Sequence, residues 1–225
     1  VRRHITSGTI EGPRPVHLPP TPMSSIPERR DIEAAQVRIA PSVHRTPVVS
    51  SGALSERIGR PVLLKCENLQ KTGSFKVRGA LNMISEMSAD ERARGVVTVS
   101  AGNHAQAVAW AATKVGMPAT VVMNARASPA KTRASEGYGA EVILHGTAWE
   151  AFELSLALAE ERELTFVHPF DDPRIVAGSA TLGIEILEDV PGPCTLVVPI
   201  GGGGLISGVS LAAALVRPGT KVFGV

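Results

Sequence analysis

From Asp31 onward, the chain alternates between two kinds of apolar pattern. Short apolar runs typical of β-strands separate longer stretches in which apolar residues recur at helical spacing. The strand-like runs are Pro61–Cys66, Val96–Ser100, Ala119–Met123, Glu141–Leu144, Thr165–Val167, Thr195–Ile200 and Lys221–Val225. The clearest helix-like stretches are Val77–Met87, Asn103–Val115, Pro129–Glu136, Trp149–Glu163, Arg174–Glu188 and Leu205–Val216. This alternation predicts an α/β fold built from βαβ units, with a parallel sheet, right-handed crossovers and helices on both faces.

Glycine, proline and serine mark several of the expected boundaries. Gly116 and Gly137 each follow a helix-like stretch and suit the left-handed conformation that commonly ends a helix. Ser128 and Pro129 predict an N-cap followed by proline at the first helical position.

The last apolar run reaches Val225, the final residue of the sequence. Domains normally end in loops rather than inside strands. We therefore expect the chain to lack the C-terminal part of its fold, either as a fragment or as a truncated protein.

Composition and charge exclude several classes of protein. Hydrophobic residues make up 44% and charged residues 20% of the chain, as is ordinary for a soluble globular protein. Its apolar stretches are too short to span a bilayer, so we expect no membrane association. The net charge of +2 is concentrated in the proline-rich residues 1–30, which we expect to form a flexible arm. Because the remaining residues have no basic bias, a nucleic-acid partner is not expected.

Cysteine and histidine usage points to neither disulfides nor a metal site. Cys66 and Cys194 lie in or beside apolar strand-like runs, which is typical of buried free thiols. The six histidines show no metal-ligand spacing. A reducing, cytoplasmic compartment fits this pattern best.

Four consecutive glycines, Gly201–Gly204, stand between a strand-like run and a helix-like stretch. Bare backbone amides at a helix N-terminus bind phosphate well, and ligands of parallel sheets lie at the carboxyl ends of strands. A flexible hinge or a tight strand-to-helix turn would also use glycine here. The loop alone is therefore not specific evidence for a phosphate site.

Lys76 is the most informative residue in the sequence. Most lysines lie at the surface, but this one follows Gly73, Ser74 and Phe75. A lysine amine beside an apolar wall loses solvation, and its neutral form becomes available for imine formation. Phe75 offers an aromatic face to a flat cofactor, and the Ser74 hydroxyl is a candidate for assisting proton transfer.

A third segment, Ser100–His104, also connects a strand-like run to a helix-like stretch. Its backbone amides are candidates for holding a substrate carboxylate. The Asn103 side chain is a candidate for bonding a phenolic oxygen, although it would equally serve as a helix cap. A lysine, a polar loop and a phosphate cradle together suggest pyridoxal phosphate chemistry.

These residues resemble the fold-type-II pyridoxal-phosphate enzymes, and most closely the threonine/serine dehydratase branch. The resemblance extends from about Asp31 to Val225. Its motifs are Glu67–Ala80, Ser100–Gln106, His168–Pro173 and Gly201–Gly204.

The resemblance implies a role for each matching residue. Lys76 would form an imine with the cofactor and then act as the catalytic acid/base. Phe75 would pack on the pyridine ring, Asn103 would bond the ring hydroxyl, and Gly201, Gly202, Gly203, Gly204 and Leu205 would bind the phosphate. The substrate carboxylate would be held by Ser100, Ala101, Gly102, Asn103 and His104. The implied reaction is α,β-elimination, which converts L-threonine or L-serine to a 2-oxo acid and ammonia.

The resemblance also implies an architecture of two doubly wound parallel-sheet domains. Residues 31–87 and 188–225 would form the large cofactor-binding domain, here incomplete, and residues 88–187 the small substrate-carboxylate domain. The cofactor would lie in the cleft between them. The family is usually a homodimer or homotetramer, so we expect self-association.

Departures from the family pattern leave alternatives open. Ser179 and Ala180 stand where family members usually have glutamine and glycine, which affects substrate fit or domain closure. A serine racemase would carry serine at Ala101 as a second base, so Ala101 favours dehydration. Val77 likewise disfavours threonine synthase, which tends to have aspartate there. A non-catalytic remnant that keeps the fold is the alternative from another class.

Overall fold

The computed structural model describes residues 26–225, so most of the predicted arm, residues 1–30, lies outside the described residues. The helices are α1 (Arg29–Ile39), α2 (Gly52–Ile58), the 3-10 turn η1 (Glu67–Leu69), α3 (Lys76–Ser85), α4 (Ala89–Arg94), α5 (Asn103–Lys114), α6 (Pro129–Gly137), α7 (Ala148–Glu161), α8 (Pro173–Asp189) and α9 (Gly204–Val216). The strands are β1 (Val48–Ser50), β2 (Leu63–Lys65), β3 (Val96–Val99), β4 (Ala119–Met123), β5 (Glu141–Leu144), β6 (Thr165–Phe166), β7 (Thr195–Val198) and β8 (Lys221–Gly224).

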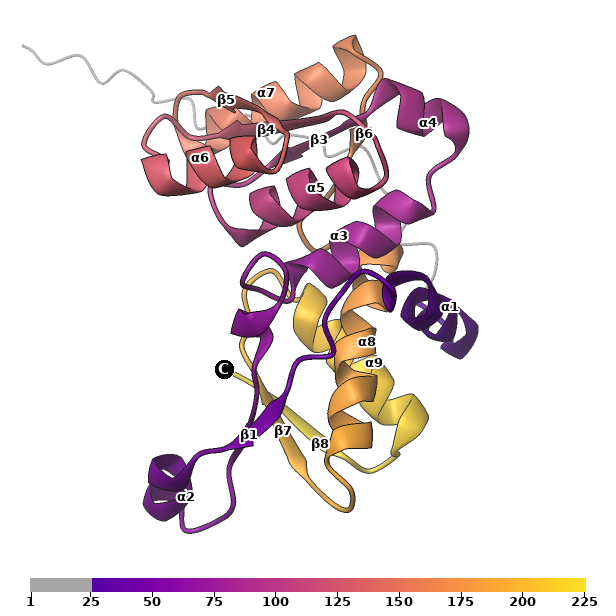
Figure 1. The fold of residues 1–225 in the computed structure, drawn as a ribbon, viewed down its shortest axis with the longest axis vertical. Coiled ribbons are helices and arrows are strands. Elements are labelled where there is room, and N and C mark those ends of the chain that lie inside the picture. Colours follow the sequence, from indigo (N-terminus) through magenta and orange to yellow (C-terminus); the bar gives the residue numbers. More distant parts are fainter. Residues whose placement is uncertain (1–25) are drawn as a thin grey trace, which may run out of the picture.

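The upper lobe of the molecule is a four-stranded parallel sheet in the order β5-β4-β3-β6 (Figure 1). Helices α5 and α6 cover one face and α7 covers the other. Alternate residues of β3 face opposite layers, because side chains of a strand alternate between its two faces. Val96 packs in the core on the α5 side, whereas Val97 packs with Ala151 and Leu158 of α7. This arrangement confirms the predicted parallel sheet with helices on both faces.

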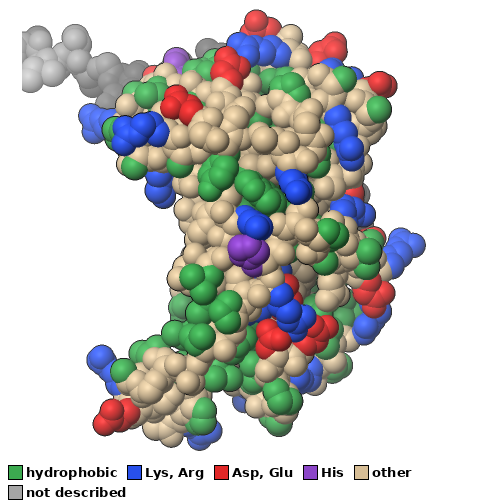
Figure 2. Space-filling model, viewed as in Figure 1, with side chains coloured by type: hydrophobic (Ala, Val, Ile, Leu, Met, Phe, Trp, Pro, Cys, Tyr) green, Lys and Arg blue, Asp and Glu red, His purple; other side chains and the backbone are tan. Residues whose placement is uncertain are grey.

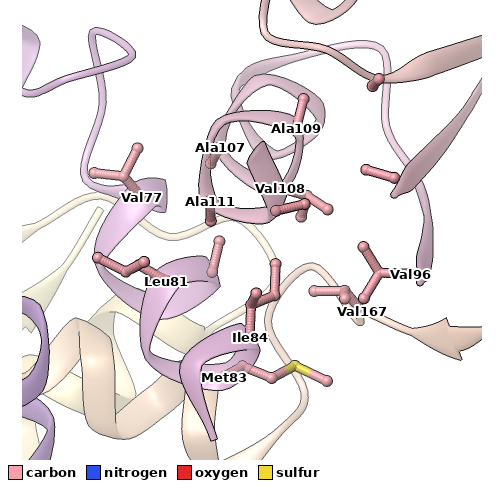
Figure 3. Close-up of a cluster of buried hydrophobic side chains, with 14 of the residues drawn as sticks. Val77, Leu81, Met83, Ile84, Val96, Ala107, Val108, Ala109, Ala111 and Val167 are labelled. Atoms are coloured by element: carbon pink, nitrogen blue, oxygen red, sulfur yellow. The ribbon is translucent and has the colours of Figure 1, made fainter. Parts of the chain in front are cut away.

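The main core lies where α3 packs against α5 (Figure 3). Val77, Leu81 and Ile84 of α3 are buried in the same cluster as the alanines of α5. Small side chains on α5 allow the two helices to approach closely, and dense packing of this kind resists displacement. The core therefore fixes the position of α3, whose first residue is Lys76.

The lower lobe consists of α8, α9, the parallel pair β7–β8 and the pair β1–β2 (Figure 1). The molecule narrows between the two lobes on the face shown in Figure 2. The β1–β2 pair is antiparallel, with Val48 opposite Lys65, so the strand-like run Pro61–Cys66 does not join a parallel sheet as expected. The reason is local. The helix α2 between these strands is too short to form the crossover that parallel strands need, so the chain reverses direction and β2 pairs antiparallel with β1.

Helices α1, α2 and α4 also form, although the apolar pattern did not single them out. Helix α2 buries no residue, and the six-residue α4 is held by a capping box between Ser88 and Glu91. Gly116 has the expected positive φ of 73°. Gly137 does not, because α6 continues through it and Gly139 takes the left-handed conformation instead, with φ of 89°. Capping glycines are thus located by sequence only to within a few residues.

Glycine permits an unusually close crossing of α3 and α8. A Cβ atom added at Gly178 would lie 2.5 Å from the Arg78 carbonyl oxygen and 2.7 Å from the Gly79 Cα. Both contacts involve backbone, which has no flexible end that could move away. The crossing therefore depends on the absence of a side chain at Gly178.

We expect Gly178→Ala to lower the free energy of unfolding by about 1–3 kcal/mol, the usual cost of overpacking. The loss should appear even though alanine is the better helix former. Urea denaturation of both proteins measures the difference.

Gly137→Ala is the matched control for that substitution. Nothing lies within 4 Å of a Cβ at Gly137, and its φ is not positive. Its stability should be unchanged or raised by up to about 1 kcal/mol. Equal stability of the Gly178→Ala variant and the wild type would show that the α3–α8 crossing adjusts freely.

Candidate functional site

The Lys76 side chain is half-buried at the start of α3. Its Nζ donates a hydrogen bond of 2.8 Å to the Pro169 carbonyl oxygen and lies 5.2 Å from the centre of the Phe75 ring. Burial lowers the pKa of the Lys76 amine, because desolvation disfavours the ammonium form. This is the environment that the sequence predicted for a reactive lysine.

A small cavity of about 10 Å³ adjoins the Lys76 side chain, which is room for about one water molecule. Residues from both lobes and from α3 line it. They are Phe75, Lys76, Gly79, His104, Pro169, Ile175, Ser179, Gly204 and Leu205. Segments far apart in the sequence therefore meet at the lysine amine.

The glycine loop leads from β7 into the first turn of α9. Gly203 has a φ of 95°, a conformation that side chains rarely adopt. A Cβ at Gly202 would overlap the Phe170 ring, and one at Gly204 would lie 2.9 Å from the Phe170 carbonyl oxygen. Packing and backbone shape thus require glycine at these three positions. Neither requires it at the exposed Gly201, where bare backbone remains without a structural reason.

The Ser100–His104 loop connects β3 to α5, as predicted. The Ser100 Oγ accepts a hydrogen bond of 3.1 Å from the Gly102 amide. Asn103 is the exposed first residue of α5 and makes no cap with its side chain. Gly102 is the N-cap residue, so the loop amides lie at the N-terminus of a twelve-residue helix.

His104 is buried beneath that loop, with Nε2 3.3 Å from the Val167 carbonyl oxygen. Desolvation, helped by the charge of Lys76, lowers the pKa of His104 to about 3. The imidazole is therefore neutral at physiological pH. Because a carbonyl oxygen only accepts, we assign the proton to Nε2.

One segment, Val167–Asp171, contacts Lys76, the buried His104 and the glycine loop. Besides the bonds to Lys76 and His104, the Val167 carbonyl oxygen accepts a hydrogen bond from Thr98 of β3, and Phe170 packs on the glycine loop. His168 Nδ1 accepts hydrogen bonds from the amides of Phe170 and Asp171, at 3.3 and 2.8 Å. These two bonds fold the segment into a turn that presents the Pro169 carbonyl to the lysine.

A buried ionic network lies two residues beyond Lys76. The Arg78 guanidinium is fully buried and donates to both carboxylate oxygens of Glu67 and of Glu185, at 2.7 to 2.9 Å. Burial opposes its charge, but the hydrogen bonds to the two carboxylates outweigh this and raise the pKa of Arg78. Lys65 of β2 joins through Glu185 at 2.8 Å. The network ties β2, α3 and α8 together.

The structure brings together only part of the predicted site. Phe75, Lys76, His104, Gly204 and Leu205 line the cavity. The other predicted residues lie outside its lining, namely Ser74, Ser100, Ala101, Gly102, Asn103, Gly201, Gly202 and Gly203.

The sequence did not identify Gly79, Pro169, Ile175 or Ser179 as site residues, although they also line the cavity. Signals existed for two of them. Pro169 lies in the His168–Pro173 motif, and Ser179 marks a departure from the family pattern. Within residues 26–225 no group of three or more metal-ligating side chains occurs. Over the same residues, no helix combines the length and apolar character needed to cross a bilayer.

Sequence comparison finds proteins named L-threonine ammonia-lyase among the relatives of this chain. The chain is 52% identical over 196 residues to the L-threonine ammonia-lyase of Thermotoga maritima, covering 87% of this chain and 49% of that protein. It is 46% identical over 195 residues to the enzyme of the same name from Geobacter sulfurreducens, covering 86% and 48%. The chain thus spans about half the length of these relatives.

Solved structures show the same fold. Maize serine racemase matches with a TM-score of 0.86 and 40% identity, covering 89% of this chain and 61% of the racemase. The processed form of threonine deaminase isoform 2 from Solanum lycopersicum matches with a TM-score of 0.81 and 36% identity, covering 88% and 56%. The family model described as pyridoxal-phosphate dependent enzyme matches residues 39–225. The chain therefore belongs to the family of pyridoxal-phosphate dependent enzymes.

Proposed function

We propose that this chain carries the lysine and the substrate loop of an ammonia-lyase that converts L-threonine or L-serine to a 2-oxo acid and ammonia. The observation that carries the proposal is the half-buried Lys76 amine, with its lowered pKa, in a cavity shared with the glycine loop. Two sequence relatives named L-threonine ammonia-lyase support this choice of reaction.

The groups around Lys76 fit pyridoxal phosphate in their chemistry. Lys76 offers an amine to the aldehyde, Phe75 an aromatic face to the ring, and Gly201–Leu205 backbone amides at the start of α9 to the phosphate. Asn103 is a candidate partner for the ring hydroxyl. When bound, the cofactor withdraws electrons from the substrate Cα and so makes its proton removable.

The residues of the chain have defined parts in this proposal. The Lys76 amine, made more available in its neutral form by burial, accepts the Cα proton. The β-hydroxyl takes a proton from a neighbouring donor, for which Ser74 is the candidate, and leaves as water; the enamine that remains is hydrolysed to the 2-oxo acid and ammonia. The amides of the Ser100–His104 loop hold the substrate carboxylate.

Ser74 immediately precedes Phe75 and is two residues before Lys76 in the sequence. It is 6% exposed and has no hydrogen-bond partner among the described residues. Buried hydroxyls are normally satisfied. Ser74 is therefore available to bond a bound ligand or to assist proton transfer, as the sequence led us to expect.

We extend the proposal to the division of the chain. Residues 31–87 and 188–225 would belong to the cofactor-binding domain and residues 88–187 to the substrate domain. The separate sheets of the two lobes support a two-part division. Helix α8 packs against α9 in the lower lobe, which favours grouping α8 with the cofactor-binding domain and a boundary near residue 172 rather than 187.

A racemase is the second candidate, because maize serine racemase is a close structural match. Racemisation requires bases on opposite faces of the substrate Cα. Ala101, which is partly buried in the substrate loop, has no group that can exchange a proton. This residue favours elimination over racemisation.

Covalent attachment of the cofactor tests the proposal first. Pyridoxal phosphate added to the wild-type chain should produce the visible absorption band of the lysine-bound form, and Lys76→Ala should abolish it. Wild-type protein should then release 2-oxo acid from L-threonine. The measurement is an absorbance titration followed by an assay of 2-oxo acid.

Lys114→Ala is the control, since Lys114 is an exposed residue at the end of α5. It should retain the full band. Absence of the band in the wild type would favour the non-catalytic alternative, and a band that survives in Lys76→Ala would place the attachment elsewhere.

The buried His104 should make stability depend on pH. An unfolded histidine has a pKa of about 6.5, whereas that of folded His104 is about 3. Between these values only the unfolded chain binds the proton, so the free energy of unfolding falls as the pH falls below about 6.5. The slope for one proton is at most about 1.4 kcal/mol per pH unit.

Urea denaturation at a series of pH values between 7 and 5 measures this slope. His104→Gln, which keeps a donor for the Val167 carbonyl, should flatten it, whereas His145→Gln at an exposed position should not. An unchanged slope in His104→Gln would mean that other groups cause the dependence.

Ala101→Ser should distinguish the two candidate reactions. A hydroxyl in the substrate loop supplies the second proton donor that racemisation needs, so the variant should raise the ratio of D-serine formed to pyruvate formed from L-serine. Chiral chromatography and a pyruvate assay on the same samples give both rates. Equal ratios in variant and wild type would remove Ala101 as the determinant.

A further inference from the structure

Lys131 lies beside the predicted substrate loop although it belongs to a different element, α6. A Cβ built at Gly102 would lie 3.8 Å from Lys131 Nζ and 3.8 Å from Ser100 Oγ. The ammonium and the hydroxyl therefore stand on the same side of Gly102, which is the N-cap of α5. His104, two residues further on, lines the cavity that also holds Lys76. Lys131 thus borders the loop that leads into this cavity.

The Lys131 side chain is partly buried, yet within the described part of the chain its ammonium has no hydrogen bond and no carboxylate within 4.0 Å. Two other basic side chains drawn toward the interior are paired with carboxylates. Lys65 contacts Glu185 and Asp189, and Arg78 contacts two carboxylates. Holding a lysine partly out of water without an anion is unfavourable, so the position is better suited to a bound anion than to the protein alone.

The surroundings add to the positive potential at this point. Lys131 is the third residue of α6, where the helix dipole repels a cation. The adjacent Gly102 begins α5, whose first-turn amides are also electropositive, and neither helix has an acidic residue in its first turn. Fold stability alone would favour an acidic residue at such a position. A carboxylate ligand would compensate all of these charges at once.

We propose that Lys131 is a substrate-binding residue, whose ammonium binds the α-carboxylate of the amino-acid substrate together with the amides of the Ser100–His104 loop. The inference rests on the proposed function, since it takes this loop as the carboxylate site. It adds a charged group from α6 to a loop otherwise made of neutral donors. The recognised feature is the carboxylate common to all the candidate substrates.

Binding of L-threonine to the wild-type chain and to Lys131→Met tests the proposal. The amide resonances of Gly102 and Asn103, followed by NMR during titration, report binding at the loop without requiring turnover. Methionine keeps the apolar length of lysine and removes only the charge. The Kd for L-threonine should rise about tenfold or more, as expected for loss of a charge-assisted hydrogen bond.

Three comparisons distinguish loss of carboxylate binding from loss of structure. Arg133→Met removes an exposed charge from the same helix and should leave the Kd unchanged. L-threoninamide, which lacks the carboxylate, should bind wild type and Lys131→Met equally weakly. Lys131→Arg should restore most of the affinity for L-threonine, since it restores the charge.

Four results would overturn the proposal: no L-threonine binding at the loop in wild type, an equal Kd in wild type and Lys131→Met, an equal loss in Arg133→Met, or an equal loss for L-threoninamide. Cofactor attachment at Lys76, measured on the same samples, distinguishes failure of the Lys131 proposal from failure of the proposed function. Attachment that persists while Lys131→Met binds L-threonine normally would contradict the role of Lys131 alone.

Discussion

The buried guanidinium of Arg78 is the interaction on which the site geometry depends. A cation removed fully from water must be compensated, and removing one partner of a buried pair typically costs about 3–5 kcal/mol. Glu67 and Glu185 provide that compensation from the turn before α3 and from α8. Lys76 is only half a turn from Arg78 on the same helix. The carboxylates that hold Arg78 therefore also fix the position of the Lys76 backbone, from which its side chain extends. The ion pairs thus act less as a store of stability than as a constraint on position.

The Val167–Asp171 segment supplies the second constraint. It has little regular structure, yet it bonds to Lys76, His104 and Thr98 and packs on the glycine loop. Aromatic contacts continue from it into the upper lobe, from Phe170 through His168 and Phe166 to Phe152. The candidate catalytic lysine therefore lies on a helix, whereas an irregular segment connects the parts of the site around it.

Sequence predicted most of the helices and the parallel sheet because burial on β-strands and helices leaves different periodicities. It did not predict the antiparallel pairing of β1 with β2, since strands of three residues are too short for a pattern. Lys76 and the two loops were found from local composition. Pro169 and Ser179 were missed as cavity residues, because the sequence does not state which segments the fold brings together. From the sequence, Gly202 was expected only to bind phosphate. The structure shows that it also has a packing role, because a side chain at this position would overlap the Phe170 ring.

The cavity beside Lys76 is completed by Gly204 and Leu205 at the start of α9. During synthesis the chain emerges from its N-terminus, and contacts between distant segments form late. Lys76 is therefore not fully enclosed until residues of α9 have left the ribosome and packed. The complete shielding of its amine arises only after Leu205 has been synthesised, more than a hundred residues after the lysine itself.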